Sequence, residues 1–184
     1  LHLYNNQLTG EIPSEIGQLI NLENLQLFNN QLTGEIPESI GALINLNSLV
    51  LYNNQFTGEI PSEIGNLINL NYLYLNDNQL SGEIPCEICN IDDSMPSLFN
   101  NQLCPPYPDC ISQSNIDSFD TSECMESSEF QGDLNSDGII NVQDVIVMVN
   151  FILNDINNEC SDINEDGLID ILDVIKLLDI ILGN

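Results

Sequence analysis

Two acidic segments near the C-terminal end carry the clearest chemistry in the sequence, one from Asp133 to Asp144 and one from Asp162 to Asp173. Each places oxygen-bearing side chains at positions 1, 3, 5, 9 and 12 of a twelve-residue segment, with glycine at position 6 and isoleucine at position 8. Side-chain oxygens at these positions, together with the main-chain carbonyl at position 7, can surround a calcium ion. Glycine allows the sharp turn that brings these ligands together.

The spacing therefore predicts two bound Ca²⁺ ions. The predicted ligands are Asp133, Asn135, Asp137, Ile139, Asn141 and Asp144 in the first loop, and Asp162, Asn164, Asp166, Leu168, Asp170 and Asp173 in the second. Three carboxylates gather in the first loop and four in the second, and they repel one another at short range when no metal is bound. We therefore expect calcium binding and folding of this segment to be linked.

An apolar stretch follows each loop, Val145 to Leu153 and Val174 to Leu182, and predicts one helix after each loop. Position 12 is aspartate, where the EF-hand has glutamate, and no helix is predicted before either loop. A duplicated loop–helix unit of this kind resembles dockerin domains, over about residues 132 to 184. The resemblance implies a small α-helical, EF-hand-related module that docks onto a cohesin-like protein, as in polysaccharide-degrading systems.

The expected recognition face of this module is apolar and acidic. Clostridial dockerins usually show serine or threonine before the last ligand, whereas this chain has Val142-Gln143 and Ile171-Leu172. Docking within the same molecule and a purely structural, calcium-stapled cap therefore remain as alternatives.

A repeat of 24 residues fills the N-terminal half of the chain. Asparagine, glycine and Ile-Pro recur in register four times, with the glycines at Gly10, Gly34, Gly58 and Gly82, and a shortened fifth copy follows. Alternating leucines such as Leu25 and Leu27 predict a short strand in each copy. A single strand cannot bury its own apolar face, so the copies must stack into a parallel sheet, with Ile16, Leu19 and Leu22 and their equivalents closing the core. The amide of the asparagine column, which begins at Asn6, is expected to bond backbone groups at the bend.

The pattern N-x-L-x-G-x-I-P resembles plant-type leucine-rich repeats, over roughly residues 1 to 111. The resemblance implies an α/β repeat solenoid with a parallel β-sheet, whose exposed strand positions recognise a partner without catalysis. The predicted ligand surface comprises Tyr4, Phe28, Tyr52 and Tyr74. Aromatic side chains in line can stack on sugars or anchor a protein. Alternatively, such ladders of aromatic side chains only stabilise the sheet. The column of glutamates that begins at Glu11 is interpreted as a solvated edge. The column of threonines that begins at Thr9 is a weak basis for ice binding.

All six cysteines lie in the second half of the chain: Cys86, Cys89, Cys104, Cys110, Cys124 and Cys160. An even number at the end of a repeat array favours disulfides and an oxidising compartment. We expect a disulfide-containing cap, with Cys89–Cys110 as the favoured pair and Cys124 as a tether for residues 112 to 131, which are predicted to be a linker. A four-thiolate zinc site and a redox C-x-x-C pair are the alternatives.

The formal net charge of −28 over 184 residues excludes partners such as nucleic acid and anionic membrane surfaces. No apolar run approaches the length that spans a bilayer. The chain opens inside the repeat pattern, so we expect a fragment boundary there. It has one histidine and shows no catalytic triad or phosphate loop.

We therefore expect a secreted or cell-surface, non-enzymatic, calcium-binding interaction protein whose repeats recognise a protein or a glycan. The alternatives are a non-catalytic fragment of a carbohydrate-active enzyme, such as an O-glycosyl hydrolase, and a structural surface protein.

Overall fold

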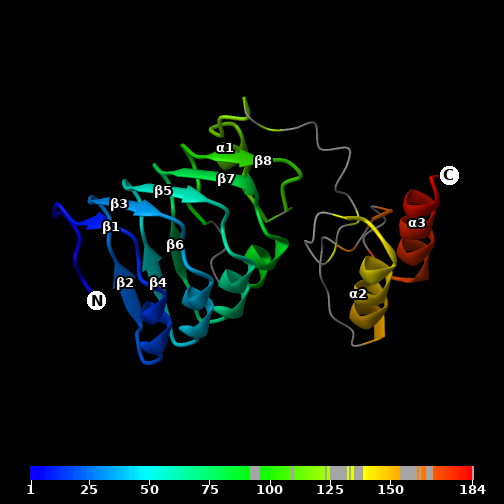
Figure 1. Ribbon diagram of the computed structural model, residues 1–184, viewed down its shortest axis with the longest axis horizontal. Helices are drawn as coiled ribbons and strands as arrows, with labels where there is room; N and C mark the ends of the chain where they lie inside the picture. The colour runs from blue at the N-terminus through cyan, green and yellow to red at the C-terminus, as the bar shows by residue number, and fades with distance from the viewer. Residues whose placement is uncertain are drawn as a thin grey trace. The chain divides into compact units, whose positions relative to one another are not determined.

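The computed structural model of the protein describes residues 1–91, 96–108, 110–122, 124, 132, 134, 139–153, 161, 163–164 and 168–183. The chain divides into two compact units, Leu1–Cys124 and Met125–Asn184 (Figure 1). The first contains the repeats, and the second contains the two helices that follow the acidic loops.

The first unit has the predicted parallel sheet of short strands. It consists of β2 (Asn24–Gln26), β4 (Ser48–Val50) and β6 (Tyr72–Tyr74), which pair in that order. The central residues Leu25, Leu49 and Leu73 lie in register and are completely buried. One leucine of each alternating pattern therefore stacks directly on its equivalent in the next repeat, as the period of two predicts.

A second parallel sheet, which we did not predict, runs along another edge of the repeats (Figure 1). Its strands are β1 (Thr9–Gly10), β3 (Gln31–Gly34), β5 (Gln55–Gly58), β7 (Gln79–Glu83) and β8 (Gln102–Cys104), in that order. The segments between the asparagine and the Ile-Pro pair are thus extended enough to pair across repeats. Each repeat adds one rung to two ladders of hydrogen bonds.

The outer segment of each repeat is a 3₁₀ helix that begins directly after the proline. The four are η1 (Ser14–Gln18), η2 (Glu38–Ala42), η3 (Ser62–Asn66) and η4 (Cys86–Asn90). Consecutive 3₁₀ helices pack closely: a Cβ atom on Gly17 would lie 2.6 Å from the main-chain oxygen of Ser39. The glycine that follows Ile16 is therefore required because the next 3₁₀ helix approaches its backbone closely, and not because of an unusual backbone angle.

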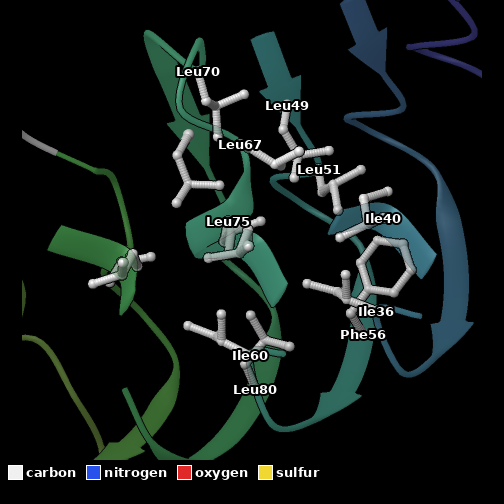
Figure 2. Close-up of a cluster of buried hydrophobic side chains, with 14 of the residues drawn as sticks. Ile36, Ile40, Leu49, Leu51, Phe56, Ile60, Leu67, Leu70, Leu75 and Leu80 are labelled. Carbon is white, nitrogen blue, oxygen red and sulfur yellow. The ribbon is translucent and has the colours of Figure 1, made fainter. Parts of the chain in front are cut away.

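Aliphatic side chains from both sheets and from the 3₁₀ helices fill the space between them. Figure 2 shows Leu49, Leu51, Phe56, Leu67 and Leu75 among the side chains of this core. One predicted core position is wrong, because Leu19 is 48% exposed whereas its equivalents Leu43 and Leu67 are fully buried. Leu19 belongs to the first repeat that the structure describes.

The asparagine column that begins at Asn6 holds the bend after each strand, as predicted. In the second repeat the Nδ2 atom of Asn30 donates to the carbonyls of Leu3, Leu27 and Phe28, at 3.0, 2.8 and 3.4 Å. Its Oδ1 atom accepts a hydrogen bond from the Leu8 amide at 3.1 Å. One side chain thereby ties two consecutive repeats together. We call this column, which continues through Asn54, Asn78 and Asn101, the asparagine spine.

The prediction that residues 112 to 131 form a linker is wrong for its first part. Residues 110–122 and 124 belong to the repeat unit, where helix α1 (Gln113–Ile116) places Asn115 as one more rung of the spine. The Asn115 Oδ1 accepts from the Leu98 amide at 3.0 Å, and its Nδ2 donates to the Pro96 carbonyl at 2.8 Å. Apolar residues interspersed among the polar ones, such as Phe119, join the core and close its end.

The second unit contains two helices, α2 (Val142–Leu153) and α3 (Ile171–Leu182), which pack against each other. Both begin three residues earlier than predicted, and Asp170 caps α3 by accepting a hydrogen bond from the Leu172 amide at 2.7 Å. Equivalent positions of the two loop–helix units contribute to its core: Met148 and Leu177 are fully buried, Ile163 is buried, and Leu134 is half-buried. Among the described helices, none is long and apolar enough to cross a bilayer.

Candidate functional site

The exposed face of the β2–β4–β6 sheet carries the predicted line of aromatic side chains. The ring of Phe28 stacks between those of Tyr4 and Tyr52, with centroid distances of 4.5 and 4.7 Å and interplanar angles of 6° and 14°. Consecutive repeats therefore present their aromatic rings in nearly parallel planes. The line ends at Asn76, which occupies the same column and is buried.

An amide ladder runs beside the rings. The Nδ2 of Asn29 donates to Asn5 Oδ1 at 2.6 Å, and the Nδ2 of Asn53 donates to Asn29 Oδ1 at 2.7 Å. These asparagines have φ angles of 54–55°, which asparagine tolerates better than most residues. Part of the regular pattern is thus explained by backbone geometry and sheet stability alone.

Side chains that differ between repeats concentrate on this same face. The three columns on the outer side of the strands read Asn24, Ser48 and Tyr72; Gln26, Val50 and Tyr74; and Phe28, Tyr52 and Asn76, and of these Ser48, Val50 and Asn76 are buried. On the other sheet the corresponding columns are constant, with glutamine at four positions and threonine or serine at four. The β2–β4–β6 sheet is therefore the face on which the chain carries non-repeating information. We call it the strand face.

Sequence reasoning missed one residue of the strand face. Tyr72 is 52% exposed, and its ring lies in a T-shaped arrangement with that of Tyr74, with centroids 6.4 Å apart and an interplanar angle of 69°. Its position two residues before Tyr74 would have placed it on the same side of the strand.

The column of glutamates packs on the glycines of the following repeat. A Cβ atom on Gly34 would lie 2.5 Å from the Glu11 Cγ, and one on Gly58 would lie 2.8 Å from the Glu35 Cγ. These glycines, which have positive φ, thus also make room for the aliphatic part of each glutamate. The packing is consistent with an edge whose carboxylates point to solvent.

Two disulfides staple the end of the repeats. The Cys89–Cys110 pair that we favoured is confirmed, and Cys104 pairs with Cys124. Because these four cysteines are bonded, the alternatives of a four-thiolate zinc site and of a redox pair between Cys86 and Cys89 are wrong. The Cys86 thiol donates to the Glu87 carboxylate at 3.5 Å, and Cys160 lies outside the described residues.

Tyr107 completes the cap. Its hydroxyl donates to the Leu103 carbonyl at 3.1 Å, and its ring contacts Phe119 with centroids 5.5 Å apart. Burial raises the pKa of Tyr107, so the hydroxyl remains a donor over the physiological range.

In the second unit, the aspartates at position 12 of both loops are completely buried. Asp144 accepts hydrogen bonds from the amides of Leu134 and Asn141, each at 2.8 Å. Asp173 accepts from the amides of Asn164 at 3.1 Å and Asp170 at 2.8 Å. Each carboxylate therefore joins the start of its helix to the start of its loop.

The remaining predicted ligands are described only in part. Asn141, Asp170, Ile139, Asn164 and Leu168 are described, whereas Asp133, Asn135, Asp137, Asp162 and Asp166 lie outside the described residues. Among the described residues, no three histidine, cysteine, aspartate or glutamate side chains gather in a cluster that could hold a metal.

The described part of each loop has donors that suit calcium. A hard cation prefers oxygen ligands, and both oxygens of the position-12 carboxylates keep a lone pair beyond the one that accepts the amide hydrogen. A buried carboxylate needs a compensating positive charge. The chain has one basic side chain, Lys176, and it is exposed. The donor set and this burial both fit a divalent cation.

Both helices expose an apolar stripe on the side away from their shared core. The stripes contain Val142, Ile146, Val149 and Leu153 on α2, and Ile171, Ile175, Leu178 and Leu182 on α3. This spacing follows one face of a helix. Ile146 and Ile175, at equivalent positions, are 57% and 50% exposed. We call these two sets the apolar stripes.

Comparison with known proteins concerns the repeat unit. The family described as Leucine Rich Repeat matches residues 1–19, 21–43, 45–67 and 69–91. No curated protein matches the chain.

Three solved structures from Arabidopsis are similar. The ectodomain of the membrane receptor kinase GASSHO1/SCHENGEN3, in complex with CASPARIAN STRIP INTEGRITY FACTOR 2, is 45% identical with a TM-score of 0.55, covering 56% of this chain and 12% of that one. The ectodomain of the receptor kinase HAESA, in complex with an extended IDA peptide hormone, is 46% identical with a TM-score of 0.54, covering 55% and 17%. The BIR3–SERK2 complex is 40% identical with a TM-score of 0.50, covering 57% and 56%.

The chain therefore spans only part of the receptors that it matches. The matched segments coincide with the stacked strands, the asparagine spine and the 3₁₀ helices described above. The likeness is to ectodomains of receptor kinases, which are solved in complex with a partner. The first unit of this protein is a non-catalytic solenoid of leucine-rich repeats.

Proposed function

We propose that the protein is an extracellular interaction protein whose strand face binds a protein or peptide segment. The observation that carries this proposal is the concentration of non-repeating side chains on the strand face. A surface of identical rungs cannot distinguish one partner sequence from another, whereas the three columns of the strand face differ from repeat to repeat. Two disulfides support an extracellular location.

The chemistry of the strand face indicates the kind of partner. Exposed tyrosines provide rigid contact area with a polar end, and such residues dominate binding energy in protein interfaces. The chain carries a net charge of −28, so a cationic segment is attracted and an anionic one is repelled. The similar HAESA ectodomain, which is solved with a peptide hormone, supports the same class of ligand.

A selection with random peptides tests the strand face. Peptides enriched on the immobilised chain from a phage-displayed library are expected to contain basic and apolar residues. Replacing both Tyr72 and Tyr74 with serine removes exposed contact area without touching the core, and should weaken the selected peptides at least tenfold. The matched control, Gln79→Ala, changes an exposed residue of the other sheet and should leave affinity unchanged. Peptides that bind both variants as tightly as the parent chain would refute the assignment.

We further propose that the second unit is a dockerin-like module that binds two calcium ions and docks the protein onto a partner, with a cohesin-like domain as the candidate. The doubled ligand spacing and the two buried position-12 carboxylates support the calcium part. The apolar stripes support the docking part, because exposed apolar patches of this regularity are characteristic of binding surfaces. A partner with basic side chains around an apolar groove fits the acidic surroundings.

Binding to a panel of purified cohesin domains in the presence of calcium tests the docking part. Ile146→Asp and Ile175→Asp together place charge in both apolar stripes and are expected to abolish binding, because each buries an unpaired carboxylate in the interface. Asn150→Asp, at an exposed position of α2, adds the same charge outside the stripe and serves as control. Retained binding by the double variant, or no binding by the parent chain to any member, would argue against docking through these helices.

A further inference from the structure

The amide ladder along the strand face is interrupted at one rung. Its column reads Asn5, Asn29, Asn53, Asp77 and Asn100, and all five residues have φ angles of 54–55°. The aspartate therefore has the same backbone conformation as the asparagines before and after it. The pairing of the backbone also continues through this rung, because the Asn53 amide donates to the Asn76 carbonyl at 3.1 Å. The departure from the repeat is confined to the side chain.

The direction of the ladder leaves two acceptors next to each other at this rung. Each asparagine donates through Nδ2 to the Oδ1 of the preceding rung, as Asn53 does to Asn29 at 2.7 Å. A carboxylate has no hydrogen to donate, so Asp77 cannot do the same for Asn53. Within the described part of the chain, the Oδ1 of Asn53 accepts no hydrogen bond. The next rung is regular again, because the Nδ2 of Asn100 donates to the Asp77 Oδ1 at 2.7 Å.

The aromatic column departs from the repeat in the same rung. Asn76 stands where the two preceding repeats have Phe28 and Tyr52, and its Nδ2 donates to the Asp77 Oδ2 at 2.6 Å. Its Oδ1 accepts from the Ser97 hydroxyl at 3.0 Å, so this short side chain is held in place and buried. Phe28 stacks on one face of the Tyr52 ring, and among the described residues no aromatic ring stacks on the other face. An aromatic face, an amide oxygen and a carboxylate therefore lie together at the end of the aromatic line.

The charge of Asp77 has no partner of opposite charge nearby in the sequence. The repeat unit contains no lysine and no arginine, because the single basic residue of this kind, Lys176, belongs to the second unit. A guanidinium group from a binding partner matches the features of this rung. Its flat face can stack on the ring of Tyr52, and its fork of N–H groups can reach acceptors one strand spacing apart, about 4.8 Å. A lysine ammonium group lacks both the flat face and the fork.

We infer that Tyr52, Asn53 and Asp77 form a subsite of the strand face that selects an arginine side chain of the partner. The inference rests on the proposed binding of a protein or peptide segment to this face, and it names one residue type that the segment must carry. In the complex, the guanidinium donates to the Asn53 Oδ1 and to the Asp77 carboxylate, and it compensates the negative charge. Both departures from the repeat in this rung then have one explanation, since Asn76 leaves room over the ring and orients the carboxylate.

N-acetylarginine amide is a probe that tests the subsite without knowledge of the partner. In NMR titrations of the whole chain, we expect it to shift the side-chain amide signals of Asn53 and Asn76 and the ring signals of Tyr52. N-acetylcitrulline amide has the same shape without the charge. It should bind about tenfold more weakly, because hydrogen bonds between charged groups are stronger than neutral ones.

Asp77→Asn is the decisive variant, because it removes the charge and repairs the ladder at once. The new Nδ2 can donate to the Asn53 Oδ1, so the repeat unit should melt no earlier than that of the parent chain. Affinity for N-acetylarginine amide should nevertheless fall about tenfold. The matched control is Glu59→Gln, which removes the same charge at an exposed position directly after β5 and should leave this affinity unchanged.

Two results would overturn the subsite: no shift of these signals with the arginine derivative, or equal affinity of the parent chain and the Asp77→Asn variant for it. The peptide selection separates this inference from the proposed function. Selected peptides that lose affinity for the Tyr72 and Tyr74 double variant, but bind the Asp77→Asn variant as tightly as the parent chain, would leave the strand face as the binding surface and eliminate the arginine subsite. A library without any binder, together with arginine binding that depends on Asp77, would refute peptide binding and retain the subsite.

Discussion

Chelation of calcium is expected to abolish the cooperative melting of the second unit while the repeat unit stays folded. With free calcium a hundredfold above the dissociation constant, each site stabilises the folded state by about 2.7 kcal/mol. A unit of this size has a total stability of roughly 3 to 9 kcal/mol, so the loss of two sites removes most of it. Calorimetry with calcium and with excess EGTA measures the effect directly.

The two units can be followed separately in one sample. All five tyrosines lie in the repeat unit, at positions 4, 52, 72, 74 and 107, so near-ultraviolet tyrosine dichroism reports only on that unit. Far-ultraviolet dichroism at the helical minimum reports mainly on α2 and α3. We expect EGTA to reduce the helical signal and to leave the tyrosine signal unchanged.

Substitution of the buried carboxylates provides the matched comparison. Asp144→Asn and Asp173→Asn retain the shape of the side chain but remove the charge that holds the cation, and each should weaken calcium binding at least tenfold. Asp179→Asn removes an exposed carboxylate from α3 and should change little. Equal melting temperatures with calcium and with chelator would exclude a role of calcium in folding.

Internal repetition explains why so much of the first unit could be predicted. Leu25, Leu49 and Leu73 had to lie in register because one-residue shifts would turn each leucine to solvent. The asparagine spine was predictable for a similar reason, since a short amide at every bend has backbone groups within reach. In each case one physical requirement recurs at every repeat, so the pattern shows it several times.

Features that occur once were not predictable in this way. Residues 112 to 122 are rich in serine and aspartate, which favours a linker, yet Asn115 and Phe119 supply the spine and core contacts that the last repeat lacks. Those contacts depend on the exposed end of the solenoid, which no local pattern encodes. The second sheet was missed because its Gln-x-Thr-Gly segments are too short for a clear period of two.

The same distinction between repeated and single features applies to the candidate sites. Tyr4, Phe28 and Tyr52 could be placed in one stack from their 24-residue spacing, and the structure confirms it. Tyr72 was missed because its column is not conserved between the repeats, and this irregularity is the property that marks the strand face as a recognition surface. In this chain regular columns explain stability, and departures from them point to binding.

The asparagine spine should be the most sensitive polar feature of the repeat unit, and Asn54→Ala is expected to destabilise it by about 3 kcal/mol. The Asn54 side chain is buried, accepts from the Leu32 amide at 3.1 Å, and donates to the Leu27 and Leu51 carbonyls at 3.1 and 2.9 Å. Its removal leaves several backbone groups without a partner inside the solenoid, and each such group costs about 1–3 kcal/mol.

Asn6→Ala is the matched control, because Asn6 occupies the same column in the first repeat but is exposed. Its amide donates to the Leu3 and Tyr4 carbonyls, each at 3.1 Å, and water can replace both bonds. The expected loss is below about 1 kcal/mol. Urea unfolding followed by tyrosine dichroism compares the two variants. If the free energy of unfolding falls with urea concentration at the same slope in both, the same amount of surface is exposed on unfolding. Equal destabilisation would mean that the asparagine acts through local backbone geometry, since burial is what distinguishes Asn54 from Asn6.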